Sequence, residues 1–185
     1  MTKDPILTFL PYLTPWFATP KMELLTMTPE EDTVLIALSK GWTSETPKHV
    51  LIRELIDAYG EKTVFAVLDK VVDAHIGAEW KEMAANSPTN TIDDILRLLW
   101  ETLIPLGFEY TAERTDNRTV MHCTKCPYVQ LGEIFGCKDI LYHLACRGDK
   151  ALTEGFNPSI EFTRTYTLME GADHCDHTYT MKEGS

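Results

Sequence analysis

Two alternating stretches near the C-terminus constrain the fold most strongly. Residues 159–168 alternate apolar and polar side chains over ten positions, a Gly-Ala-Asp turn follows, and residues 174–181 alternate again. A period of two is typical of strands with one buried face, and the turn between them predicts a β-hairpin. A second hairpin is predicted from residues 108–114 and 119–123. The sequence therefore predicts four antiparallel strands.

The preceding part of the chain carries apolar side chains at helical spacing instead. Thr28, Thr46 and Thr91 stand where helices begin, and Gly60 and Gly107 where helices end. Helices are predicted at 28–38, 47–59, 61–85 and 92–103, and between the two hairpins at 128–135 and 139–152. The predicted fold class is α+β, in which an N-terminal helical lobe packs with a C-terminal four-stranded antiparallel sheet containing two inserted short helices.

This pattern divides the chain into three parts. Residues 1–20 form an N-terminal arm with four prolines, residues 21–106 the helical lobe, and residues 107–185 an α+β domain that contains every cysteine. We expect the lobe and the domain to form one compact unit. The aromatic arm either packs on its own body or docks on a second copy as a homodimer contact.

Charge and hydropathy exclude several classes of partner. The chain has 17 Lys and Arg against 28 Asp and Glu, a net charge of −11, which disfavours nucleic-acid binding. No apolar run reaches the roughly 18–20 residues that a membrane helix needs. The apolar stretch at residues 6–17 is interrupted by Pro11 and Pro15. It also lacks the basic flank and the small-residue cleavage site of a signal peptide. We therefore expect a cytoplasmic protein whose partner is a small-molecule substrate or ligand.

The five cysteines all follow residue 122, which suggests that cysteine side chains have a functional role in the C-terminal domain. Cys123 and Cys126 have the Cys-x-x-Cys spacing found in zinc and iron–sulfur sites, although no second such pair is present. A zinc ion or an iron–sulfur cluster is therefore one hypothesis. Its candidate ligands are Cys123, Cys126, Cys146, Cys175 and His177.

Thiolate chemistry is a second hypothesis. On an extended strand Cys175 and His177 share one face, so they suit a nucleophile with a base, or two ligands. On the preceding helix His143 and Cys146 share a side, and Asp149 follows about a turn later. The plain alternative is that individual cysteines are small buried apolar residues.

At these residues the sequence resembles the L-2-amino-thiazoline-4-carboxylic acid hydrolase family. The resemblance covers about residues 108–181 and is most specific near the end. It rests on Cys126-Pro-Tyr128, Leu131-Gly132, and the runs 144–149, 156–168 and 171–179.

The resemblance implies a hydrolase acting on carbon–nitrogen bonds other than peptide bonds. In the family's founding activity, water adds to the ring carbon between sulfur and nitrogen of a cyclic amidine, giving a carbamoyl-cysteine product. The matching positions are Cys126, Cys146, Asp149 and Cys175. Either Cys146 or Cys175 attacks as a thiolate while Asp149 handles a proton, or the cysteines, with His177, hold a metal that activates water.

The sequence is also consistent with two other functions. One is a metal- or iron–sulfur-binding redox or sensor protein with cysteine ligands. The other is a non-catalytic small-ligand-binding domain of the 4-vinyl-reductase shape. For the enzyme, we expect a pocket between the sheet and the two short helices, on which Cys146, Asp149 and Cys175 converge.

Overall fold

The computed structural model of the chain describes residues 28–30 and 47–182. The predicted arm at 1–20 and most of the predicted helix at 28–38 lie outside the described residues. The longer helices are α3 (Lys48–Tyr59), α4 (Glu61–Ala85), α7 (Pro127–Phe135) and α9 (Asp149–Phe156). The short helical segments are α5 (Ile92–Ile95), η4 (Leu96–Trp100), α6 (Glu101–Leu103), η5 (Ile104–Leu106), α8 (Lys138–Leu141), η6 (Tyr142–Cys146) and η7 (Leu168–Glu170). The predicted bounds of α4 are confirmed.

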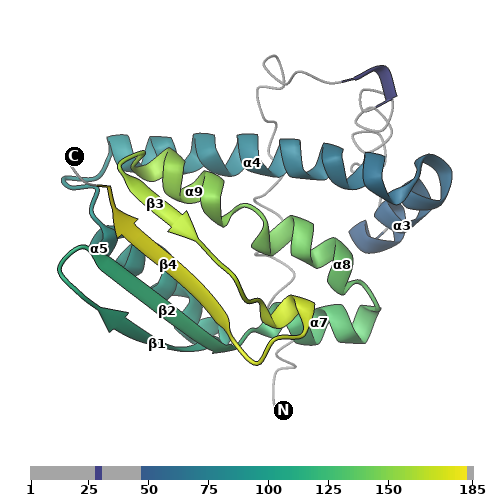
Figure 1. The fold of residues 1–185 in the computed structure, drawn as a ribbon. Coiled ribbons are helices and arrows are strands. Elements are labelled where there is room, and N and C mark those ends of the chain that lie inside the picture. Colours follow the sequence, from purple (N-terminus) through teal and green to yellow (C-terminus); the bar gives the residue numbers. More distant parts are fainter. Residues whose placement is uncertain (1–27, 31–46, 183–185) are drawn as a thin grey trace, which may run out of the picture.

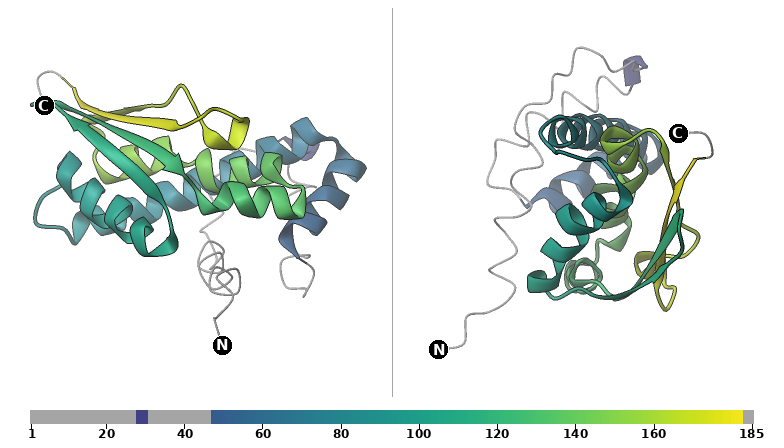
Figure 2. Two further views of the ribbon diagram at one scale, coloured as in Figure 1. Left: turned by 90° about the horizontal axis from the view of Figure 1, so that it is seen from below. Right: turned by 90° about the vertical axis from the view of Figure 1, so that its left-hand side faces the viewer.

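Four antiparallel strands form one sheet in the order β1-β2-β4-β3. Their bounds are β1 (Glu109–Arg114), β2 (Arg118–Lys125), β3 (Ile160–Thr163) and β4 (Cys175–Met181). The two predicted hairpins join through β2 and β4, and this central pairing places Cys123 opposite Cys175. The described helices lie on one side of the sheet (Figure 2). The α+β prediction is confirmed.

β3 is shorter than the alternation predicts. The ladder between β3 and β4 ends at Thr163, so the predicted strand through residue 168 is wrong. The carboxylate of Asp176 accepts hydrogen bonds from the backbone N–H groups of Thr165 at 2.8 Å and Tyr166 at 2.6 Å. These side-chain bonds take the place of ladder bonds, and the chain leaves the sheet directly after β3.

The predicted helix at 139–152 is wrong as a single element. It is divided into α8, the π-helical η6, a turn at Arg147 and Gly148, and then α9. The predicted helix at 92–103 likewise contains a π-helical segment, η4. Its start is as predicted, because Thr91 and Asp94 form a capping box.

Close packing of α4 against α9 brings the helical lobe and the C-terminal domain together (Figure 1). A Cβ atom at Gly155 would lie 2.3 Å from the carbonyl oxygen of Gly77, so only glycine fits there. One core cluster includes Trp80 and Trp100 from the helical part and Ile160 and Tyr179 from the sheet. Helices and sheet therefore share a hydrophobic core. No helix in the described ranges is long and apolar enough to span a membrane.

Candidate functional site

A cavity of about 310 Å³ lies between the helices and the sheet. Its lining includes every site residue predicted from the sequence: Cys123, Cys126, Cys146, Asp149, Cys175 and His177. The sequence prediction placed the pocket between the sheet and the two short helices and left out one wall. This wall is formed by α4 and η4, which line the cavity through Trp80, Met83 and Trp100 among others. The structure thus brings the predicted residues together, while their individual roles stay predictions.

Cys175 begins β4, and the backbone N–H of Leu168 donates to its sulfur at 3.2 Å. Cys123 lies opposite it on the neighbouring strand β2, and the Cys123 thiol donates to the carbonyl oxygen of Lys125 at 3.3 Å. Interaction with the neighbouring Cys123 thiol contributes most to a lowered pKa of Cys175, and Leu168, His177 and Arg164 add to the effect against the opposing influence of burial. This environment favours a thiolate at Cys175.

The other thiols of the cavity are held in the protonated form. Interaction with the neighbouring Cys175, followed by burial, raises the pKa of Cys123. Burial raises the pKa of Cys126 to about 11. Burial and the neighbouring Asp149 carboxylate raise the pKa of Cys146. Of the two thiols named as candidate nucleophiles, the structure therefore favours Cys175 over Cys146.

A charged cluster stands beside Cys175 in the cavity. Arg164 Nη1 donates to Asp149 Oδ2 and, at 3.0 Å, to the carbonyl oxygen of Cys146. His177 Nε2 lies 3.3 Å from the same Asp149 oxygen. The three side chains are only 9%, 16% and 12% exposed for Arg164, Asp149 and His177. Burial of the carboxylate is tolerated because a guanidinium and an imidazole share it.

His177 is held in place from both sides of its ring. Its ring centroid lies 4.9 Å from that of Trp100 in an edge-on arrangement, while Nε2 faces Asp149. Nε2 also lies 3.4 Å from Arg164 Nη1, so it faces a carboxylate and a guanidinium together. Nδ1 is buried and has no hydrogen-bond partner among the described residues.

Two functional side chains were missed by sequence reasoning. Arg164 occupies an apolar phase of the alternation at 159–168, a pattern that indicates a buried charge and could have singled it out. Trp100 had no such signal, because tryptophan at helical spacing is ordinarily a core residue. His143, considered beside Cys146, instead stacks on Phe65 and lies 2.6 Å from Asp69.

Both π-helical segments of the described chain contribute to the cavity. η4 supplies Leu98, Leu99 and Trp100, and η6 supplies Ala145 and Cys146. A π turn inserts one extra residue into a helix and re-aims the side chains around it, which is why such turns are frequent at functional sites. Here they turn side chains of two separate helical regions toward the same cavity.

The geometry does not support the predicted metal site. Within residues 28–30 and 47–182, no group of three or more His, Cys, Asp or Glu side chains is arranged to hold a metal ion. Cys123 and Cys126 are also not arranged like the two cysteines of a Cys-x-x-Cys metal site. Cys123 lies in β2 and its sulfur contacts Cys175, while Cys126 follows the end of the strand.

The comparisons with known proteins assign a family. A family model described as L-2-amino-thiazoline-4-carboxylic acid hydrolase matches residues 43–179. This match extends the resemblance seen at 108–181 back through α3 and α4, where the sequence showed no recognisable motif. No curated protein and no solved structure matches the chain. The chain, cavity residues included, belongs to the L-2-amino-thiazoline-4-carboxylic acid hydrolase family.

Proposed function

We propose that this protein is a cytoplasmic hydrolase that opens a small cyclic amidine of the thiazoline type, with Cys175 as the nucleophile. The observation that carries the proposal is the position of the Cys175 sulfur, which accepts from the Leu168 N–H at 3.2 Å inside a cavity of about 310 Å³. Such a volume suits a small molecule. The family name supports a hydrolase, and the chemistry of the site supports a thiolate mechanism.

In the proposed reaction, the Cys175 thiolate adds to the amidine carbon. The electron pair of the C=N bond moves to nitrogen, which takes a proton. One ring bond of that carbon then breaks, and the leaving atom is protonated. Water then adds to the carbon bound to Cys175, and the carbon–sulfur bond to the enzyme breaks to restore the thiolate as the C=O bond forms; the two protons that the water loses balance those taken up by the nitrogen and the leaving atom.

His177 and Asp149 have different parts in this scheme. The Asp149 carboxylate is already engaged by Arg164 and His177, so we assign it to orienting His177. We assign the proton transfers to His177, which gives a proton to the leaving atom when the ring bond breaks and then takes a proton from the attacking water. Cys126 and Cys146, whose pKa values burial raises, are assigned to the wall of the cavity.

The test combines turnover with capture of the intermediate. The purified protein is incubated with 2-amino-thiazoline-4-carboxylic acid and related cyclic amidines, and products and protein adducts are measured by mass spectrometry. We expect turnover, an adduct on Cys175, and a loss of at least about 1,000-fold in kcat for Cys175→Ser.

The matched control is Cys137→Ala. Cys137 is buried in a second core cluster, which also includes Ile52, Val64 and Ile140, and it does not line the cavity. We expect this variant to retain turnover. Full activity in Cys175→Ser would remove Cys175 from the mechanism. Binding of the amidines without any turnover would instead identify a non-catalytic ligand-binding domain.

A further inference from the structure

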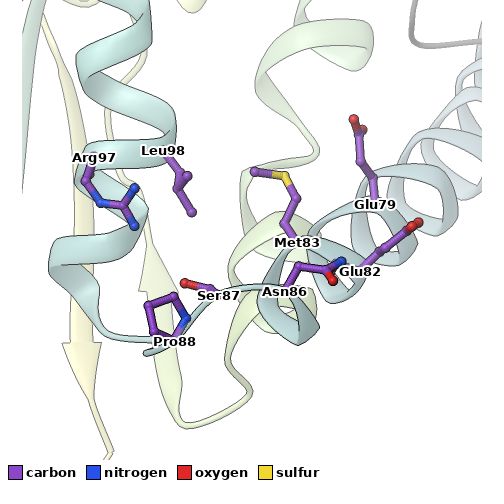
Figure 3. A pocket seen from close by; sticks show the side chains of 8 residues that line it. All are labelled: Glu79, Glu82, Met83, Asn86, Ser87, Pro88, Arg97 and Leu98. Carbon is purple, nitrogen blue, oxygen red and sulfur yellow. The ribbon is translucent and has the colours of Figure 1, made fainter.

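A second, outer pocket adjoins the cavity. It has a volume of about 420 Å³ and lies between the C-terminal part of α4 and the η4 segment (Figure 3). Three residues line both the outer pocket and the inner cavity: Glu79, Met83 and Leu98. The two spaces therefore adjoin at these three residues.

Two of the three residues at this partition, Met83 and Leu98, are apolar. Met83 on α4 and Leu98 on η4 point toward one another across the gap between the helices (Figure 3). Both are half-buried. Methionine has three rotatable bonds and adapts readily to its surroundings, and side-chain rotations of this kind need no backbone movement. Met83 is therefore the most adaptable of the side chains that line both spaces.

The charge at the partition is negative. The Glu79 side chain is 56% exposed, and its ion-pair partner His75 is 4.0 Å away. Arg97, which lines the outer pocket, is neutralised by Asp94 at 3.0 Å. Glu82 adds a second carboxylate to the outer pocket. The local charge at the partition therefore favours a molecule that carries a positive charge.

We propose that the outer pocket is the entrance to the cavity, that Met83 and Leu98 form its gate, and that Glu79 selects small molecules with a protonated amine or amidinium group. The inference names a substrate class for the proposed hydrolase. Its test uses Cys175 only as a reporter of access, so the result does not depend on whether the protein hydrolyses anything.

The gate is tested by the size dependence of alkylation. The modification rate of Cys175 is followed by peptide mapping with iodoacetamide and with the bulkier N-benzylmaleimide. We expect Leu98→Trp to slow the maleimide at least about tenfold while iodoacetamide changes little, and Met83→Ala to accelerate the maleimide. Leu51→Ala, which truncates a half-buried side chain at the second core cluster, is the control.

Because a bulky substitution can disturb folding, the two gate variants are chosen to act in opposite directions. Circular dichroism checks that each retains its helix content. If Leu98→Trp and Met83→Ala both leave the maleimide rate at the wild-type value, access to Cys175 lies elsewhere and the proposed gate is wrong.

Charge selection is tested with two methanethiosulfonates of similar size, one bearing a trimethylammonium group and one a sulfonate. We expect Glu79→Gln to lower the ratio of cationic to anionic rates at Cys175 about threefold, as expected for one screened charge near the path. Glu61→Gln is the matched control, because Glu61 is an exposed carboxylate at the other end of α4. An unchanged ratio in Glu79→Gln would overturn the selective role of this residue.

Discussion

At Cys175, burial and hydrogen bonding act on the thiol in opposite directions. Burial alone raises the pKa of a thiol, as it does at Cys126 and Cys146. At Cys175 the neighbouring Cys123 thiol and a backbone N–H that donates to the sulfur outweigh burial, and the net pKa is lowered. Residues of the same type in one cavity thus differ because of the donors that each sulfur meets.

Replacing the donor at Cys123 should shift the titration of Cys175. In Cys123→Ala the thiolate loses the neighbouring thiol that contributes most to lowering its pKa, so the pKa of Cys175 rises toward that of a free thiol, about 8.5. The rate of Cys175 alkylation by iodoacetamide, measured from pH 5 to 10, should therefore have its midpoint at higher pH. At pH 7 the variant should react more slowly.

The control for this prediction is Cys123→Ser, which keeps a donor at the same position. We expect its midpoint to lie between those of the wild type and Cys123→Ala. Identical midpoints in the alanine variant and the wild type would mean that Cys123 does not influence the Cys175 thiolate.

The cavity residues could be predicted from sequence largely because the family resemblance marked their positions. What distinguishes Cys175 from Cys146 could not be predicted in this way. The difference depends on the register that places Cys123 opposite Cys175 and on the Leu168 N–H, and a sequence pattern does not fix either. Arg164 was missed because a strand was expected to continue through it.

At the level of elements, periodicity predicted regular segments well and their interruptions poorly. α4 has the predicted bounds because its apolar face is long and a glycine precedes it. η4 and η6 could not be predicted, because a π turn changes the helix by one residue and leaves the apolar spacing nearly intact. The early end of β3 depends on Asp176, eleven residues away from Thr165.

The close contact of α4 and α9 gives a prediction for Gly155→Ala. Alanine favours a helix by about 1 kcal/mol over glycine, but its Cβ would lie 2.3 Å from the backbone oxygen of Gly77. The backbone of Gly77 cannot move aside by a side-chain rotation, so α4 and α9 must move apart. We expect a net loss of about 1–3 kcal/mol in the free energy of unfolding, measured with urea.

Glu154→Ala serves as the control on the same helix, since Glu154 is exposed and pairs only with the exposed Lys150. Its free energy of unfolding should change by no more than about 0.5 kcal/mol. Unchanged or increased stability in Gly155→Ala would show that the two helices are less tightly packed than described.

For the whole molecule, the shared core joins the helical part to the sheet. The indole N–H of Trp100 donates to the hydroxyl of Tyr179 at 3.1 Å, and Tyr179 is completely buried. Trp80 packs edge-on against Phe156 with ring centroids 5.6 Å apart. Separation of the two parts would expose these aromatic side chains and leave a buried hydrogen bond unmade.

We therefore expect one cooperative unfolding transition. Urea unfolding followed by circular dichroism at 222 nm, which reports helix, and by tryptophan fluorescence, which includes Trp80 and Trp100 of the shared core, should give the same midpoint. Two distinct midpoints would contradict the prediction that the helical lobe and the cysteine-containing domain are one unit.

The segment that links β3 to β4 carries both Arg164 and Leu168, whereas α4 and η4 supply the opposite wall of the cavity. In the proposed mechanism, the groups beside the Cys175 sulfur and the helical wall that faces a bound molecule therefore belong to separate stretches of chain. We expect substitutions in α4 and η4 to change which molecules fit the cavity while leaving the pKa of Cys175 unchanged.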